Sequence, residues 1–334
     1  MRNILTIYTF ATAVALFLLF LSPIFLLLAG PFALLIGLAL LVSGILTAMF
    51  VYDYMTYAVE EYKDFAPQGV GLSVLFTLSY AVMYMSLMAL SLLGSGAVNL
   101  AVWASVMISA ALMLYVMKNV PLHLTSGNPL LDVAAGVKTL PLALLVGLPL
   151  AWIFAAFYEA LRMFARRAFM AGISVIASIF LAPLALLFLS AADVSAADFV
   201  ISVFAPLLNT NSMQFTGVEV LAWPGIIGWE ELSSRFMLPA VGPLANYMFV
   251  VLHAPSRWLM ALFLAPAILA VISMGTRWLT EVYKKHGLIG SIAAHSVYNG
   301  MLGWLAGLIY FPLLTLVTLI VLAIAYIYVK TRET

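Results

Sequence analysis

Runs of about 20 consecutive apolar residues recur along almost the whole chain, and they constrain its fold more than any other feature. A helix needs roughly 20 apolar residues to cross the hydrocarbon core of a membrane. The candidate runs are residues 4–28, 32–58, 71–94, 97–117, 139–161, 168–192, 217–240, 258–280, 288–309 and 312–329, with shorter runs at 199–209 and 244–256. The pattern predicts an all-α, polytopic transmembrane bundle of roughly 8–11 helices.

The composition supports this class. Charged residues make up only 8% of the 334 positions, and hydrophobic residues make up 66%. A soluble domain carries about 25% charged residues because water must solvate its surface. Lipid must therefore cover most of this chain, and we expect an integral, multi-pass membrane protein. A net charge of +1 without a basic cluster predicts no nucleic-acid partner, and the absence of cysteine excludes disulfides, cysteine nucleophiles and thiolate metal sites.

The polar segments between the apolar runs are too short to form a soluble domain, so we expect a single membrane domain in two parts. Residues 1–140 carry no motif and form extra transmembrane helices, whereas residues 141–334 carry every motif described below. Basic residues near span ends favour the cytoplasm. Those at 162–167, 284–285 and 330–332 share one side if the runs cross as given, which places Arg235 near the cytoplasmic face.

The stretch GWEELSSRFMLP, residues 228–239, places three ionisable groups inside an apolar run. Such groups are expensive in a membrane and usually mark a function. Glu231 and Arg235 are four residues apart on a helix, a spacing that by itself is equally consistent with a purely structural ion pair. Glu230 points about 100° away from Glu231 on a helix and has no cation on its own face, so a structural pair leaves it unexplained.

Two of the four histidines also lie in apolar runs, His253 at the end of FVVLH and His295 at the start of HSVYN. His123 and His286 lie in polar segments, and we expect both to be solvated. Asn299 follows His295 by four residues, so the two side chains share one helix face. In a site of low dielectric constant, two neutral donors side by side can stabilise an oxyanion.

These residue types together predict a hydrolase that activates water without a covalent nucleophile. A desolvated carboxylate and an imidazole can share a water molecule and accept its proton. Ser233 and Ser234 lie close by, but neither has the G-x-S-x-G context of a nucleophilic serine. The H-E-x-x-H motif of zinc proteases is absent, although a metal held by Glu230 and two histidines stays open as an alternative.

The same residues resemble a known family. E-E-x-x-x-R at 230–235, F-x-x-x-H at 249–253 and H-x-x-x-N at 295–299, in this order, resemble the type II CAAX prenyl endopeptidases and the wider group of CAAX proteases and bacteriocin-processing enzymes. The stretch KKHGLIGSIAAHSVYNG also resembles the family's glycine-bearing turn before the second histidine helix. The resemblance covers roughly residues 145–310.

The resemblance implies an intramembrane glutamate endopeptidase that uses no cofactor and no metal. Glu230 and His253 would activate the water, and His295 and Asn299 would form the oxyanion hole. The implied partners are membrane lipid and a peptide or protein substrate, including lipidated ones such as CAAX-like or prenylated C-termini.

By the same resemblance, Glu231 and Arg235 would hold the site in shape. Two features depart from the family pattern: Ser234-Arg235-Phe236 replaces an aromatic residue followed by Arg-Gly, and the 23-residue step from Glu230 to His253 is short. Two other functions stay open. One is a binding or scaffolding protein that keeps the fold without proteolysis. The other is a transporter whose buried charges line a permeation path, although no internal repeat supports it.

Overall fold

The computed structural model describes residues 31–61, 123–191, 227, 230–232, 234–235, 244–302, 308 and 312–331. These residues form helices and connecting turns, with no strand among them. Four described stretches are long and apolar enough to cross a membrane, namely Gly37–Ala58, Pro129–Val146, Phe169–Phe188 and Leu262–Asn299. The predicted all-α membrane bundle is therefore confirmed. The runs at 4–28, 71–94, 97–117 and 199–209, and most of 217–240, lie outside the described residues.

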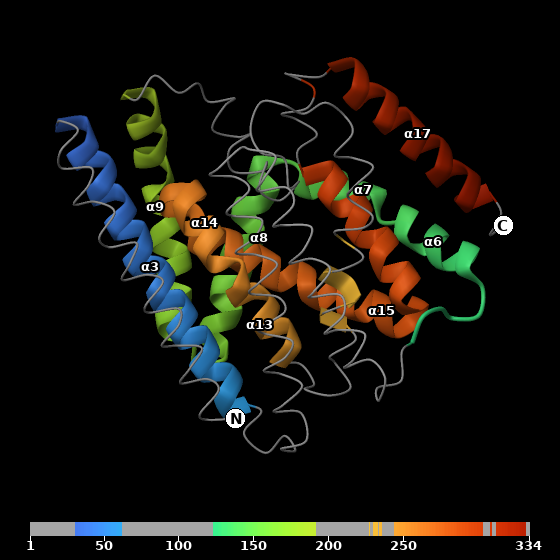
Figure 1. Ribbon diagram of the computed structural model, residues 1–334, viewed down its shortest axis with the longest axis horizontal. Helices are drawn as coiled ribbons and strands as arrows, with labels where there is room; N and C mark the ends of the chain where they lie inside the picture. Colours follow the sequence, from blue (N-terminus) through green and yellow to red (C-terminus); the bar gives the residue numbers. More distant parts are fainter. Residues whose placement is uncertain are drawn as a thin grey trace, which may run out of the picture.

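Three helices match their predicted runs closely: α3 (Pro31–Glu61), α9 (Phe169–Ala191) and α17 (Pro312–Thr331). In Figure 1, α3 and α9 lie side by side at one end of the molecule, and α17 lies at the other end beside α6 (Pro129–Val137). Between the two ends runs the long helix α15 (Ala265–Leu302), which contacts helices on both sides. Many large apolar side chains of α9 and α17 are exposed, as expected of surfaces that face lipid.

The prediction of one continuous span at 139–161 is wrong. The chain forms α6, then α7 (Leu140–Val146), and then a separate α8 (Pro149–Ala165). Leu148 adopts an extended conformation because the ring of the following proline disfavours helical backbone at the preceding residue. The apolar stretch that begins at Pro129 takes the place of this span, and the Asn128 side chain caps its first turn.

The short run at 244–256 divides into two helices, α13 (Leu244–Leu252) and α14 (Ala254–Ala261), which meet at His253. A single turn of 3-10 helix, η2 (Leu262–Leu264), then leads into α15. The predicted runs 258–280 and 288–309 correspond to the two halves of α15, which begins at Ala265 and is divided at Gly287, between the two runs.

A break at Gly287 interrupts α15 at the predicted glycine turn. Gly287 has φ 64° and ψ −168°, which no helical residue adopts. At about 1.5 Å per residue, the 38 residues of α15 would measure about 57 Å if straight, almost twice the roughly 30 Å of the hydrocarbon core. The break instead lets α15 change direction, and its second half carries the H-x-x-x-N motif (Figure 1).

The loop before α6 fixes this break. The backbone N–H of Leu288 donates to the carbonyl of His123 at 2.9 Å, and that of Ile289 donates to Leu124 at 3.1 Å. The first N–H groups of a helix have no partner within the helix, so the loop supplies the acceptors that the second half of α15 needs. The position of the H-x-x-x-N motif therefore depends on a loop about 165 residues earlier in the chain.

A second polar contact set anchors the first half of α15. Arg277 of α15, a partly exposed side chain, forms an ion pair with the buried Glu159 of α8 and donates to Ser273 at 2.8 Å. The Ser273 hydroxyl also lies 2.8 Å from the hydroxyl of Tyr54 on α3. These contacts tie α3, α8 and α15 together, and the apolar core around them holds the helices that carry the candidate site.

Candidate active site

A buried cavity of about 40 Å³ brings together residues from all three motifs. Its described lining residues are Glu230, Phe249, His253, Arg257, Ile272, Gly275, Thr276, Leu279, His295, Tyr298 and Asn299. A water molecule needs about 10–15 Å³ of such space, so the cavity has room for a small number of waters. The structure therefore places four predicted site residues, Glu230, His253, His295 and Asn299, around one space of suitable size for a water.

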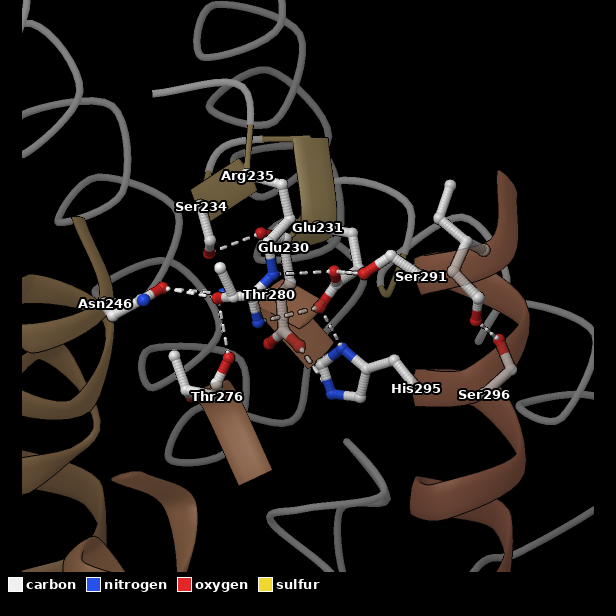
Figure 2. A network of polar contacts seen from close by, with 11 residues as sticks. Glu230, Glu231, Ser234, Arg235, Asn246, Thr276, Thr280, Ser291, His295 and Ser296 are labelled. Carbon is white, nitrogen blue, oxygen red and sulfur yellow. Dashed lines mark hydrogen bonds and ion pairs between the residues drawn. The ribbon is translucent and has the colours of Figure 1, made fainter. Parts of the chain in front are cut away.

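Glu231 does not line this cavity but lies behind it, completely buried. Figure 2 shows three different side chains directed at its carboxylate. The Nε–H of Arg235 donates to Oε2 at 3.0 Å, the hydroxyl of Ser291 also donates to Oε2, and Nδ1 of His295 lies 2.7 Å from Oε1. Because both oxygens are occupied, this carboxylate is a fixed acceptor that orients its neighbours.

Arg235 extends the network to two further helices. Its Nη1 donates to Oδ1 of Asn246 on α13 at 2.7 Å and to the hydroxyl of Thr280 on α15 at 2.8 Å. The Thr280 hydroxyl also donates to Asn246 at 3.1 Å. Sequence analysis missed Asn246 and Thr280. A buried guanidinium has five N–H donors and needs more acceptors than one glutamate offers. The presence of an arginine in an apolar run therefore indicated that further polar side chains lie near it.

His295 connects the two glutamates. Its Nδ1 contacts Glu231, and its Nε2 lies 3.7 Å from Oε2 of Glu230. Glu231 already accepts from Arg235 and Ser291, so it is ionised and Nδ1 of His295 must carry the proton. In the neutral imidazole, Nε2 is therefore an acceptor, and it donates only when the ring holds a second proton.

His253 has the same tautomer for a different reason. Its Nδ1 lies 2.7 Å from the carbonyl oxygen of Phe249, which can only accept, so Nδ1 carries the proton. The Phe249 ring packs against the imidazole with centroids 4.6 Å apart and limits its rotation. Because His253 sits at the turn between α13 and α14, its Nε2 is an oriented acceptor in the cavity wall.

Glu230 and Asn299 complete the predicted set, and both are nearly buried. Ser234 donates from its hydroxyl to the backbone carbonyl of Glu230 at 2.6 Å, within the helical turn that presents the two glutamates. Asn299 lies one turn after His295 on the second half of α15, so both side chains face the cavity as the four-residue spacing predicted.

Arg257 and Thr276 are polar cavity residues that the sequence analysis missed. Arg257 follows His253 by four residues and is only 3% exposed, and Thr276 is 2% exposed. The spacing of four residues after a motif histidine was a signal for Arg257. Thr276 carried no signal, because a threonine in an apolar helix is common.

The two remaining histidines lie away from the cavity. His123 is exposed, as predicted. His286 was also predicted to be solvated, but Nδ1 of this half-exposed side chain lies 3.4 Å from Oδ1 of the buried Asp132. Asp132 accepts hydrogen bonds from Thr125 and Ser126 in the loop that caps the second half of α15. His286 therefore belongs to the loop contact that fixes α15.

Metal binding requires ligand side chains to lie closer together than the histidines and carboxylates of the described part of the chain do. Zinc takes three or four nitrogen, oxygen or sulfur ligands at about 2.0–2.3 Å. Over the described part of the chain, no group of three or more His, Cys, Asp or Glu side chains is arranged to hold a metal ion.

Comparison with known proteins gives no relative. No family model matches the chain, and no curated protein or solved structure matches it either. Function has therefore to be inferred from the motifs and from the cavity that they form.

Proposed function

We propose that this membrane protein is an intramembrane endopeptidase that hydrolyses a peptide bond with an activated water molecule. One observation carries the proposal: three motifs far apart in sequence contribute Glu230, His253, His295 and Asn299 to a single buried cavity. Ionisable side chains are costly inside a membrane domain, and their gathering around one space is a feature of functional sites.

Water activation falls to Glu230 and His253. The Glu230 carboxylate and Nε2 of His253 both offer acceptors to a water in the cavity. The water oxygen forms a bond to the carbonyl carbon, its proton passes to Glu230, and the carbonyl π electrons move to oxygen. The tetrahedral intermediate then re-forms C=O, the C–N bond breaks, and the proton is delivered to the leaving amine.

The negatively charged oxygen of the intermediate needs donors in the cavity wall. Asn299 offers its amide N–H groups. His295, which the resemblance places beside it as the second donor, donates from Nε2 only as an imidazolium, since Glu231 holds the other ring proton. Glu231 and Arg235 have the supporting role in this proposal, because they fix the ring of His295 and stay out of the cavity.

The proposed substrate is a peptide or protein segment that reaches the site within or next to the membrane. Phe249, Ile272 and Leu279 supply apolar walls beside the polar groups. We propose CAAX-like C-termini, with or without a prenyl group, as the substrate class, and a cytoplasmic opening for the site. The resemblance of the three motifs to CAAX proteases and the distribution of basic residues support these two points.

The proposal is tested by incubating the purified protein in detergent with a quenched fluorescent CAAX peptide in prenylated and unprenylated forms. We expect fluorescence to rise with time, and mass spectrometry to identify one cleaved bond. Absence of cleavage of both peptides, by protein that unfolds cooperatively, would contradict the proposal and favour a binding or scaffolding role. Uptake of solute into proteoliposomes would favour a transporter.

A further inference from the structure

Asn299 is one hydrogen-bond donor to the oxyanion of the proposed hydrolysis. The contacts of His295 prevent its neutral ring from being the second. The ring proton of neutral His295 is on Nδ1, bound to Glu231 at 2.7 Å, and Nε2 is directed toward Glu230 at 3.7 Å (Figure 2). A neutral imidazole in this arrangement accepts at Nε2 and cannot donate to an oxyanion. A different cavity residue must therefore hold a proton at all times if the site is to stabilise the developing charge.

Arg257 meets this requirement. Among the described lining residues it is the only lysine or arginine, and its guanidinium keeps its protons at every accessible pH. It comes from α14, one turn after His253, so the histidine that accepts a hydrogen bond from the water and the arginine that donates one to the oxyanion lie one helical turn apart. Its near-complete burial keeps bulk water away from the charge, which strengthens its interaction with an anion.

Charge balance also favours Arg257. The charge of Glu231 is compensated by Arg235, which does not line the cavity. Glu230 and Arg257 are then the carboxylate and the guanidinium of the described lining. When Glu230 takes the proton of the water, one negative charge disappears from its carboxylate and one appears on the carbonyl oxygen. The same cation therefore balances the cavity before and after the attack.

Thr276 offers a second hydrogen-bond donor to the oxyanion. It lies on the first half of α15, whereas Arg257 lies on α14. Its hydroxyl is fully buried, and it has no hydrogen-bond partner among the residues that the structure describes. A buried hydroxyl without a partner is unfavourable, and a bound substrate oxygen would supply the missing hydrogen-bond partner. Thr276 lines the same cavity as Arg257.

We infer that Arg257, with the hydroxyl of Thr276, binds the carbonyl oxygen of the scissile peptide bond and stabilises its negative charge in the tetrahedral intermediate. This inference rests on the proposed function and adds two catalytic residues to it. Water supplies the oxygen that bonds to the carbonyl carbon, Glu230 takes the proton, and the electron pair displaced onto the carbonyl oxygen accepts hydrogen bonds from Arg257 and Thr276. His295 then stays bound to Glu231 and takes no part in binding the oxyanion.

The kinetic test compares Arg257→Gln, Arg257→Lys and the wild-type protein on the quenched peptide. Loss of one oxyanion donor lowers kcat by about 10²–10³-fold, so we expect that loss in Arg257→Gln with KM changed only a few-fold. Arg257→Lys keeps the charge and should retain part of kcat. Thr276→Val should lower kcat about tenfold, whereas Thr276→Ser should restore it. Wild-type kcat in Arg257→Gln or in Thr276→Val would overturn the inference.

A binding test separates this inference from the proposed function, because it needs no turnover. The probe is a phosphinate analogue of the peptide, whose tetrahedral anionic group resembles the intermediate, and the control is the uncharged analogue with CH2–CH2 in place of the scissile CO–NH group. We expect Arg257→Gln to weaken phosphinate binding more than tenfold and to leave binding of the CH2–CH2 analogue unchanged. If the wild-type protein cleaves nothing, the proposed function fails and phosphinate binding alone decides. Equal binding by wild type and a folded Arg257→Gln, weakening of both ligands alike, or no binding at all would overturn the inference.

Discussion

Replacement of Arg235 by alanine should remove the cation that holds Glu231 in the interior. Both side chains are completely buried and joined at 3.0 Å. Removing one partner of a buried ion pair costs about 3–5 kcal/mol, because the other charge is left uncompensated. The other two acceptors of Arg235 add little to this cost, since Thr280 and Asn246 keep their own hydrogen bond at 3.1 Å. We therefore expect Arg235→Ala to lower the free energy of unfolding by about 3–5 kcal/mol.

The assay is denaturant unfolding of purified protein in detergent micelles. The double variant Glu231→Gln/Arg235→Ala should regain part of the loss, because no unpaired charge stays buried. Lys284→Ala provides the matched control: it removes an ion pair with Glu281 of similar length, 2.7 Å, in which both side chains are about 60% exposed. This control should change stability by less than about 1 kcal/mol. If Arg235→Ala costs no more than Lys284→Ala, the buried network does not support the site.

Two further predictions concern the break in α15 and metal. Gly287→Ala should destabilise the protein by more than about 1 kcal/mol, because φ is 64° and an added Cβ would lie 2.6 Å from the backbone nitrogen of Thr125. Gly275→Ala is the control, since the nearest atom to its added Cβ would be the Tyr298 hydroxyl at 3.8 Å. An unchanged unfolding midpoint in Gly287→Ala would contradict this. Peptide cleavage should also survive a chelator, because the described residues form no three-ligand group. About one zinc per active chain, with activity lost to the chelator and restored by zinc, would show the opposite.

The membrane helices were predictable where one apolar run forms one helix, as in α3, α9 and α17. Hydropathy alone did not locate the helix boundary at Leu148, because the residues on both sides of the break are equally apolar. The signal there was Pro149, which disfavours helical backbone at the residue before it. At Gly287 the polar segment YKKHG and the resemblance predicted a turn, and the structure has a glycine with positive φ there.

The meeting of the three motif segments was predictable, whereas their hydrogen bonds were not. Spacing places His295 and Asn299 on one helix face, and the cost of burying charge predicts that Glu230 lies near them. No pattern in the sequence indicates that Nδ1 of His295 binds Glu231 rather than facing the cavity. That contact depends on how the break at Gly287 orients the second half of α15, which is a tertiary property.

The most direct test of the account is the cleavage rate of Glu230→Gln beside that of the wild-type protein. Glutamine has nearly the same shape as glutamate but cannot take a proton from water. The account predicts that cleavage of the quenched peptide falls at least 10³-fold while the unfolding midpoint stays the same, because Glu230 acts in the cavity and not in the Glu231–Arg235 network. Cleavage by Glu230→Gln at the wild-type rate would contradict the claim that this carboxylate activates the water.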